Sequence, residues 1–485
     1  MTAQVMDLPA TGTRRLRSTD AVTLLSIYTF LLLVIPSPLT FAPLGGAGGP
    51  ATIFAVLLLL CYLITLVNPP LALRRGAQPI RIAAVVLTCA VLAAYISANR
   101  HPLPSLEQNG ADRGLILMFG WLGVMLVAAD GVPSMERLNT LLRRIIMGAT
   151  AMAALAITQF FTGLNAALYI QIPGLTAQTP FTDLLTRGQL NRPSATAIDP
   201  IELAVVLAIC LPIALHRARF AEPGLKRRRW LQVALIGIAL PMTVSRTAII
   251  ALIVASIVVL STWPKRDRRI AYVVGLIALA GLFVTVHSLL GELGSLFTQV
   301  GSDTSSASRT GAFGSAVPFI SQHPWFGRGF GTFLPSTYFF TDDQYLLSLI
   351  EIGFVGLIAL LGIFVTGWMT ARNARRVSSD PEARHLAQCL AASIAAPTVA
   401  FATLDALSFA MAASLTFLVL GCAGALWRLV RTEVPAARPE TRRAEKEPPP
   451  PRGGPPSTAD GPRPSAPRQS PSLEWDDTAP IPVVR

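Results

Sequence analysis

The chain has 485 residues, of which 52% are hydrophobic and only 14% are charged. Its apolar residues fall in blocks of about 17 to 22, the length of an α-helix that crosses the hydrocarbon core of a bilayer. This pattern excludes an ordinary soluble protein and predicts an all-α, polytopic membrane protein. The formal charge of +13 would suggest nucleic-acid binding in a soluble protein. Here the basic residues concentrate between apolar blocks, so no nucleic acid is expected as a partner.

The first half of the chain contains six predicted spans. They lie at about 21–37, 51–67, 81–98 and 114–129, in a block that ends near 162, and at about 199–215. The first span lacks a clean small-residue cleavage site, so we expect it to be retained rather than removed as a signal peptide. A longer polar loop, 163–198, precedes the sixth span.

The second half adds about six more spans. The apolar stretch 231–263 is too long for one crossing and is interrupted by Pro241 and a polar group around Arg246, so it is predicted to form two. Further spans are expected at about 270–290 and 345–370, separated by a large polar loop, 291–343. The last apolar region, about 387–430, bends near Asp405 into two more. The total is about twelve within a transmembrane domain of residues 21–430.

Basic residues alternate along the connections between spans. Every second connection, beginning with residues 1–20, collects most of the arginines and all three lysines (Lys226, Lys265 and Lys446). The positive-inside rule therefore predicts that both termini are cytoplasmic and that the loop 291–343 is extracytoplasmic. Residues 431–485 are rich in Pro, Arg, Glu and Ser, a composition that predicts a disordered cytoplasmic tail.

Of the arginines on the side where the charge rule depletes them, three lie within or beside sequence at membrane depth. Arg192 precedes the sixth span, Arg246 lies at the break in 231–263, and Arg309 lies in the large loop. An arginine beside hydrocarbon is costly, which indicates a partner, and the planar guanidinium fork suits phosphate best. The alternative is structural ion pairing of Arg192 with Asp199 or Glu202, and of Arg246 with Asp405.

Two adjacent acids, Asp342 and Asp343, stand at the start of the tenth span. A carboxylate beside arginines at an interface could act as a general base toward a sugar hydroxyl. The same two residues could equally be a solvated end of the loop.

The run from His323 to Gly331, HPWFGRGFG, carries His323 and Arg328. It superficially resembles a dinucleotide fingerprint, but it neither follows a strand nor opens a helix, so we reject that interpretation. Its tight turns could bring backbone N–H groups close to an anion. His323 precedes Pro324, which favours a turn histidine over a catalytic one.

Upstream in the same loop, apolar residues recur at helical spacing between Ser288 and Val300, which predicts a helix on the outer leaflet. No metal or cofactor is expected. The cysteines lie in apolar runs without close pairs, as small core residues do (Cys61, Cys89, Cys210, Cys389 and Cys422).

The order of these motifs resembles the O-antigen ligase/polymerase superfamily. The resemblance covers roughly residues 20–430 and rests on Arg192-Pro193-Ser194 with Asp199-Pro200, on Ser245-Arg246-Thr247, on Arg309, on the run His323 to Gly329, and on Asp343-Gln344-Tyr345-Leu346 with Glu351, Gly353 and Gly356. It implies a multi-pass glycosyltransferase of the inner (cytoplasmic) membrane, without a metal or nucleotide sugar. The substrate would be a glycan on undecaprenyl pyrophosphate in a lipid environment.

The same resemblance assigns roles to individual residues. Arg192, Arg246 and Arg309 would bind the pyrophosphate, Asp342 or Asp343 would be catalytic, and His323, Arg328, Gln344 and Tyr345 would support the loop or site. Ligases carry a His-Asn pair where this chain has the two aspartates, so the polymerase branch is the closer likeness. Ala195 stands where a glycine is common.

The leading hypothesis is thus an inverting polysaccharide polymerase with its active site outside, in the cell-envelope route to exopolysaccharide or O-antigen. A chain-length regulator or a flippase is a candidate partner. One alternative is a ligase that attaches glycan to a cell-wall polymer or a protein. Another, from a different class, is a polysaccharide-lipid transporter, which is disfavoured because the polar residues cluster at one face.

Overall fold

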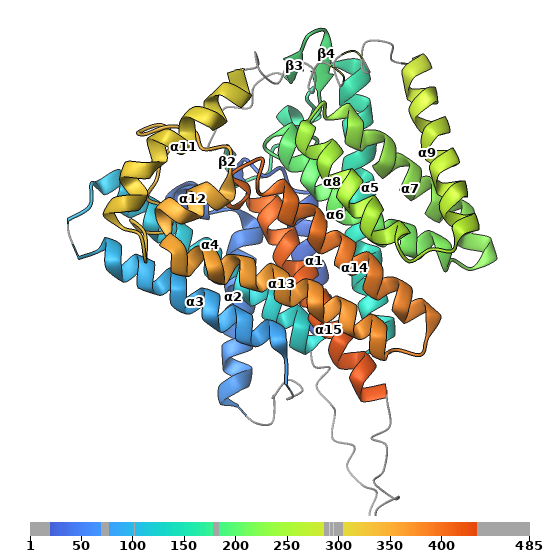
Figure 1. The fold of residues 1–485 in the computed structure, drawn as a ribbon, viewed down its shortest axis with the longest axis horizontal. Helices are drawn as coiled ribbons and strands as arrows, with labels where there is room; N and C mark the ends of the chain where they lie inside the picture. Colours follow the sequence, from blue (N-terminus) through green and yellow to red (C-terminus); the bar gives the residue numbers. More distant parts are fainter. Residues whose placement is uncertain are drawn as a thin grey trace, which may run out of the picture. The chain divides into compact units, whose positions relative to one another are not determined.

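A computed structural model describes residues 20–68, 77–100, 102–177, 184–285, 291, 294 and 304–433, and Figure 1 shows that they are mainly helical. The first helices are α1 (Ala21–Leu33), α2 (Pro50–Val67), α3 (Pro79–Ala98), α4 (Ser105–Gly131), α5 (Met135–Thr162), α6 (Pro200–Arg219) and α7 (Lys226–Met242). They are followed by α8 (Arg246–Leu260), α9 (Lys265–Thr285), α11 (Thr304–Gln322), α12 (Gln344–Glu351), α13 (Gly353–Val377), α14 (Pro381–Ala400) and α15 (Ala410–Glu433).

The described strands form two short antiparallel pairs. β1 (Leu39–Thr40) pairs with β2 (Thr176–Ala177), and β3 (Leu185–Arg187) pairs with β4 (Leu190–Arg192) as a hairpin. Short 3-10 segments lie at Ala42–Ala47, Ala166–Tyr169, Pro223–Leu225 and Ala406–Ser408. The all-α class is therefore confirmed.

Seven of the described helices are long and apolar enough to cross a membrane, namely α2 to α6, α13 and α15, while α1 and α8 are shorter apolar helices. A helix lies at each predicted span, and the chain breaks where prediction placed the breaks, after Met242 and around Asp405. A multi-pass membrane protein is confirmed at this level. The number of about twelve crossings stays a prediction.

The predicted loop 291–343 contains a helix, α11, in its middle part. The helix expected between Ser288 and Val300 falls almost entirely outside the described residues. Residues 1–19 and 434–485 also lie outside them, so the boundaries of the N-terminal segment and of the tail stay predictions.

The core is organised around α15, which packs against α4, α13, α14 and α6. An apolar helix surrounded on all sides has no polar face to present, and most of α15 is accordingly buried. Trp121 of α4 stacks on Phe417 at 5.6 Å and donates its Nε1–H to Ser414 Oγ at 3.1 Å. At Gly421 an added Cβ would lie 2.5 Å from the carbonyl oxygen of Met125, so this small residue permits the close approach of the two helices.

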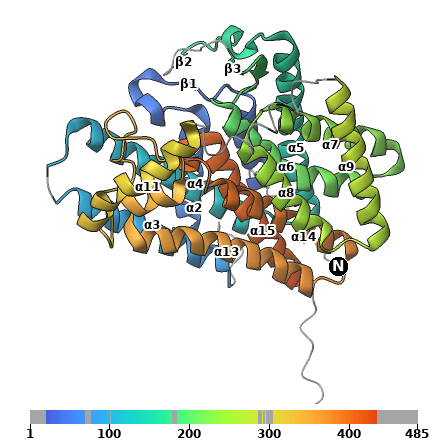
Figure 2. The same cartoon turned by 45° about the horizontal axis from the view of Figure 1, so that its top comes forward.

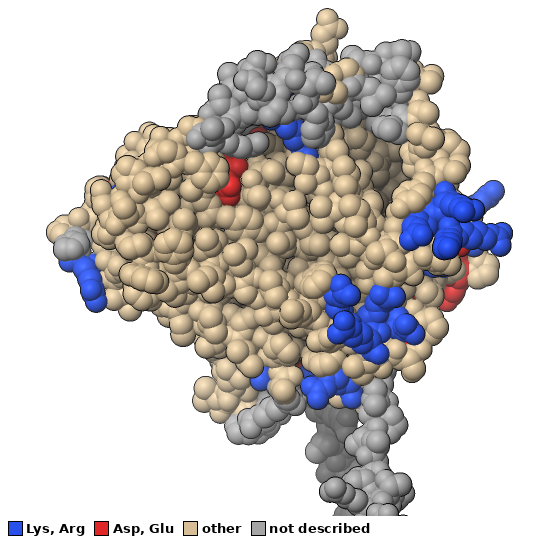
Figure 3. Space-filling view, in the orientation of Figure 1, with Lys and Arg blue, Asp and Glu red and all other residues tan. Residues whose placement is uncertain are grey.

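The basic connections meet at one end of these helices. Arg219 forms an ion pair with Asp267 at 2.6 Å, Arg217 donates to the Asn139 carbonyl, and Arg137 pairs with Asp20. Figure 3 shows the basic side chains gathered over the ends of α7 and α9 and over the turn between α13 and α14. The alternation of basic connections along the chain thus corresponds to one physical end. Which side of a membrane that end faces stays a prediction.

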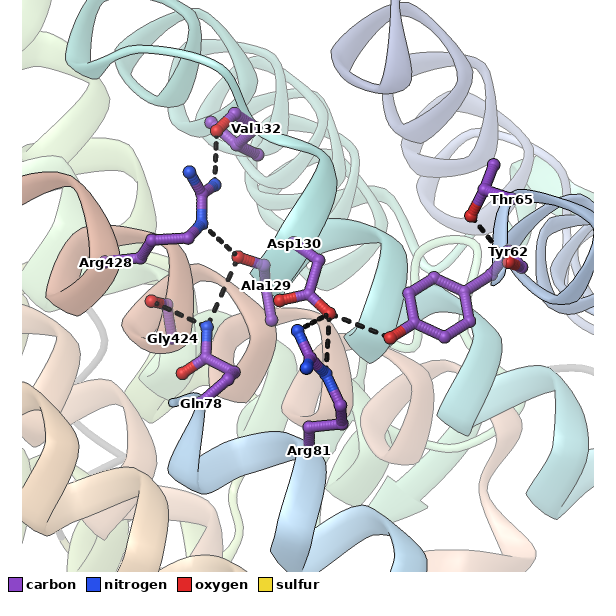
Figure 4. Close-up of polar contacts among 9 residues, drawn as sticks. All are labelled: Tyr62, Thr65, Gln78, Arg81, Ala129, Asp130, Val132, Gly424 and Arg428. Atoms are coloured by element: carbon purple, nitrogen blue, oxygen red, sulfur yellow. Dashed lines mark hydrogen bonds and ion pairs between the residues drawn. The ribbon is translucent and has the colours of Figure 1, made fainter. Parts of the chain in front are cut away.

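A buried polar cluster ties four helices together at this basic end (Figure 4). Asp130 Oδ2 accepts from Tyr62 at 2.8 Å and from both Nε and Nη2 of Arg81, at 3.1 and 2.8 Å. Gln78 bonds to the carbonyls of Ala129 and Gly424, and Arg428 bonds to those of Ala129 and Val132. The cluster thereby fixes α2, α3, α4 and α15 with a matched acid and base.

Candidate functional site

Interrupted helices meet at the other end. The break between α7 and α8 touches the break between α14 and α15, because the hydroxyls of Thr247 and Thr403 lie 2.7 Å apart. The start of α12 joins them, since the backbone N–H of Gln344 bonds to the carbonyls of Phe401 at 2.8 Å and Leu404 at 3.1 Å. Irregular backbone among apolar helices is tolerated where it is partnered or lines a cavity, so this junction is the natural place for a site.

The first predicted arginine is held at this junction by the β3–β4 hairpin. Arg192 ends β4, and its Nε donates to the carbonyl of Thr243 at 3.2 Å, in the break that precedes Arg246. Burial lowers the pKa of Arg192, while the nearby Asp199 carboxylate opposes that shift and Arg187 adds to it. Arg192 is therefore a partly buried cation beside the segment that carries the second predicted arginine.

Arg246 is the first residue of α8 and is half-buried. The preceding residue, Ser245, takes the N-cap position without a side-chain capping bond. A helix N-terminus carries partial positive charge on its first N–H groups, which adds to the positive potential of the arginine. Two of the three predicted phosphate-binding residues are thus brought together.

Three aspartates from distant segments share the junction. Burial raises the pKa of Asp405, and the negative charges of Asp342 and Asp199 raise it further. Burial likewise raises the pKa of Asp199, with Asp342 adding to the shift and Arg192 opposing it. Burial and like charges therefore both raise the pKa of Asp199 and of Asp405, and carboxyl groups perturbed in this way cluster at functional sites.

The two adjacent aspartates differ in what they contact. Asp343 caps α12, because its Oδ1 accepts from the N–H groups of Tyr345 at 2.8 Å and Leu346 at 3.2 Å. Asp342 precedes the cap with φ of 47°, a left-handed conformation, and is one of the charges that act on Asp405. Of the two candidates for catalysis, Asp342 belongs to the acid group and Asp343 holds the helix start.

Gln344 and Tyr345 position the segment that carries Asp405. The fully buried Gln344 accepts from the Leu407 N–H at 2.7 Å and donates to Ser348 Oγ at 3.1 Å. Tyr345 donates its hydroxyl proton to the Thr398 carbonyl at 2.5 Å. These contacts join α12 to the bend between α14 and α15.

The glycine-rich run braces the interruption between α12 and α13. The N–H groups of Arg328 and Gly329 bond to the carbonyls of Ile350 and Glu351, at 3.0 and 2.9 Å. On the far side of the break, the N–H of Phe354 bonds to the Pro324 carbonyl at 2.9 Å. These bonds satisfy backbone groups that the helix ends leave open, and they occupy two of the N–H groups that were considered for an anion.

The remaining predicted site residues lie apart from this group. Arg328 bonds to Glu107 at 3.2 Å and to the Tyr338 hydroxyl at 2.7 Å, in a network that ties α4 to the loop after α11. His323 is exposed, and its carbonyl accepts the N–H of Gly327 in a turn. Arg309 lies in α11, with its side chain outside the described part of the structure.

Two buried glutamates were not predicted as site residues. Glu202 was considered only as a partner for Arg192. Instead, Glu202 Oε1 accepts from the N–H groups of Met411 and Ala412 at the start of α15, and Oε2 accepts from Ile198. Glu351 Oε1 accepts from the Phe333 N–H at 3.2 Å, and burial raises the pKa of Glu351 to about 8. In the sequence, Glu351 could have been singled out as an acid inside an apolar run, two positions before Gly353.

A comparison with protein-family models gives a match to O-Antigen ligase over residues 231–361. The match shows that this segment of the chain is similar to the O-antigen ligase family. A search of curated proteins found no match. The predicted resemblance is therefore confirmed, and it places the chain among membrane proteins of the glycan-transfer type. The matched segment includes Arg246 and Asp342, whereas Arg192, Asp199 and Asp405 join the site from outside it.

Backbone strain coincides with the site. Among the described residues, the non-glycine residues with positive φ are Ala195 at 54°, Val244 at 47° and Asp342 at 47°. Each stands within three positions of Arg192, Arg246 or Asp343. Such conformations cost on the order of 1 to 3 kcal/mol each and cluster where function requires them. The glycine that is common at the position of Ala195 would adopt this φ without strain.

Proposed function

We propose that the chain transfers glycan from undecaprenyl pyrophosphate to an acceptor sugar hydroxyl at the extracytoplasmic face of the cytoplasmic membrane. The single observation that carries the proposal is the convergence of Arg192 and Arg246 with the acid group of Asp342, Asp199 and Asp405. This junction lies away from the connections that hold most of the basic residues, which supports an extracytoplasmic site.

The reaction would be a single displacement. The acceptor oxygen attacks the anomeric carbon and forms the new glycosidic bond. The bond from that carbon to the pyrophosphate oxygen breaks, and its electron pair leaves with the lipid diphosphate. The hydroxyl proton passes to the carboxylate of Asp342. Attack opposite the leaving group inverts the anomeric configuration.

The chain's cations act on the leaving group in this scheme. Negative charge grows on the diphosphate as the bond breaks, and fixed guanidinium groups stabilise that charge without reorganising. Arg192 is held by its bond to Thr243 and Arg246 by its place at the start of α8, so both are preorganised. Arg309, on α11, is the third candidate. In this proposal the arginines supply the charge stabilisation that a metal gives in other transferases.

Transfer between two lipid-linked chains, that is polymerisation, is the form we favour, because an aspartate stands where ligases carry histidine. Single substitutions Arg192→Ala and Arg246→Ala test the assignment in cells, by polymer length and by the amount of protein in the membrane. Each should lower transfer by about 100-fold to 1,000-fold at a normal protein level. Arg143→Ala, an exposed residue of α5, is the control and should leave the polymer unchanged.

The fate of the repeat unit separates the alternatives. Single repeats that accumulate outside support a polymerase, and polymer that is complete but unattached supports a ligase. Repeats retained inside would indicate a transporter instead. Full-length polymer from both arginine variants would rule out the diphosphate assignment.

A further inference from the structure

A cavity of about 400 Å³ lies between α11 and the loop that leads into the acid group. Its floor is one face of α11, where Gly311, Ala312 and Ser315 recur at helical spacing. The loop contributes the opposite wall with Pro335, Tyr338, Phe339 and Phe340. The volume falls within the range of about 300 to 1,000 Å³ that is usual for small-molecule sites.

We infer that this cavity is a subsite for a sugar ring of the acceptor glycan. The inference rests on the proposed transferase function and adds where its second substrate binds. A sugar presents C–H groups on its faces and hydroxyls around its edge. The cavity offers the matching surfaces, with aromatic rings for the face and the Ser315 hydroxyl for the edge.

The aromatic wall is held rigidly. Tyr338 stacks on Phe333 at 4.8 Å, and its hydroxyl donates to Glu107 Oε1 at 2.5 Å while accepting from Arg328. Phe339 packs edge-on against Phe333 at 5.0 Å. A wall that is already ordered loses little entropy when a ligand binds, which suits a binding surface more than a mobile loop. This gives a physical role to Arg328, which was expected only as a site support.

The position of the cavity fits an acceptor. Phe340 and Asp342 are separated by one residue, Thr341, and these two steps along an extended chain span at most about 7 Å. In Figures 1 and 2, α11 lies to one side of the start of α15, and α8, which begins with Arg246, lies to the other. The diphosphate and the acceptor would therefore approach the acid group from opposite sides, as a displacement requires.

The chemistry of α11 favours a glycan over a lipid chain. The face of α11 that lines the cavity carries the Ser315 hydroxyl, and α11 is not among the described helices that are apolar enough to cross a membrane. A polyprenyl chain would be expected against an apolar helix. An exposed aromatic ring, Phe340, in a cavity that also holds the Ser315 hydroxyl is better suited to a hydrated ligand.

Matched glycine substitutions on α11 provide the test. A Cβ added at Gly311 or at Gly314 would meet nothing within 4 Å, so neither change disturbs packing. Only Gly311 lines the cavity. Gly311→Leu should therefore fill the subsite, while Gly314→Leu on the same helix should leave it open. Phe340→Ala, at an exposed ring, removes part of the wall and is the second variant.

The assay uses the full-length protein in detergent micelles with the host's lipid-linked repeat as donor. The acceptor is a fluorescently labelled repeat-unit oligosaccharide, released from the same pool by mild acid. Gly311→Leu and Phe340→Ala should raise the apparent KM for this acceptor about tenfold or more, with kcat changed less than about threefold. Gly314→Leu should keep both constants. Inhibition by farnesyl pyrophosphate, a short isoprenoid diphosphate, should be the same in all variants.

Three results would overturn the inference. An unchanged acceptor KM in both cavity variants, while Arg192→Ala abolishes turnover, removes the subsite and keeps the transferase. Loss of farnesyl pyrophosphate inhibition in Gly311→Leu assigns the cavity to lipid. Full turnover by Arg192→Ala removes the transferase function itself, and the subsite with it.

Discussion

The two ends of the helical unit treat buried charge in opposite ways. At the basic end, Asp130 accepts three hydrogen bonds on one oxygen, two of them from Arg81 (Figure 4). At the interrupted end, Asp199, Asp342 and Asp405 repel one another, and the backbone is strained at Ala195, Val244 and Asp342. In the Asp130 cluster, the buried acid is paired with a base, which stabilises the fold. The interrupted end holds unfavourable charge and geometry in place, which is the usual mark of a working site.

The contrast also explains how the strained end is held. Fully buried side chains fasten each interrupted helix to its neighbour. Gln344 accepts the N–H of Leu407 in the bend between α14 and α15, and Glu202 accepts N–H groups at the start of α15. Gln159 accepts the N–H of Ala195 at 2.7 Å. Hydrogen bonds to backbone groups can fix an irregular segment without neutralising the charged side chains it presents. These bonds thus fix the backbone of the site.

The largest effect is expected from the two adjacent aspartates. Asp342→Asn removes the proposed base and should lower transfer by about 100-fold to 10,000-fold. Asparagine tolerates left-handed φ, and its neutral side chain removes the repulsion between Asp342 and the other two aspartates. The unfolding temperature should therefore be unchanged or higher. Asp343→Asn is the matched control, because asparagine also caps helices. Transfer by purified protein, beside its unfolding temperature, is the measurement. Equal losses in the two variants would contradict the division of roles.

At the basic end the same kind of change should affect stability rather than transfer. Asp130→Ala leaves Tyr62 and Arg81 without their acceptor and should cost about 3 kcal/mol, below the upper figure for buried pairs because Arg81 is 34% exposed. The control is Asp267→Ala, which breaks the more exposed pair with Arg219 and should cost less than about 1 kcal/mol. Unfolding in mixed micelles measures both. A stable Asp130→Ala protein with lost transfer would break the contrast between the ends.

The buried acid beneath the site predicts how stability depends on pH. Burial raises the pKa of Glu351 from 4.5 to about 8. Because the folded-state pKa is the higher, the stabilising contribution is full below about 4.5 and is lost as pH rises through 8. The slope approaches about 1.4 kcal/mol per pH unit between these values. Glu351→Gln should flatten the profile of unfolding free energy against pH. A profile that stays as steep would show that other groups set it.

Much of the fold could be predicted from the sequence, because each span is a local property of length and hydropathy. The breaks near Pro241 and Asp405 were also predicted, since polar residues inside long apolar runs are local signals. The helix α11 was not predicted, because a segment that contains several glycines and serines is more typical of a loop. Arg192 and Arg246 were grouped by their placement against the charge rule, and the resemblance added the pyrophosphate as their ligand. The bond from Arg192 to Thr243 shows how the fold brings their segments close.

The division of labour among the acids could not be predicted in this way. Glu202 caps a helix that starts more than two hundred positions later, with a sequence separation of 209 to Met411. Asp342 and Asp343 are chemically identical neighbours, and only the φ of 47° at Asp342 and the capping bonds of Asp343 distinguish them. Such differences arise from tertiary contacts and backbone geometry, which leave no pattern in composition or spacing.

The smallest effect tests the strain directly. Ala195→Gly loses a buried methyl group, about 0.8 kcal/mol, and adds the entropic cost of glycine, about 0.5 to 1 kcal/mol. It also relieves a left-handed alanine at φ of 54°, worth about 1 to 2 kcal/mol, so the net change should be close to zero. Ala197→Gly, in the same buried turn without positive φ, has both losses and no relief. It should cost about 1.5 kcal/mol. The difference between the two unfolding free energies is the strain stored beside Arg192, and equal costs would mean that the strained backbone at this end stores none.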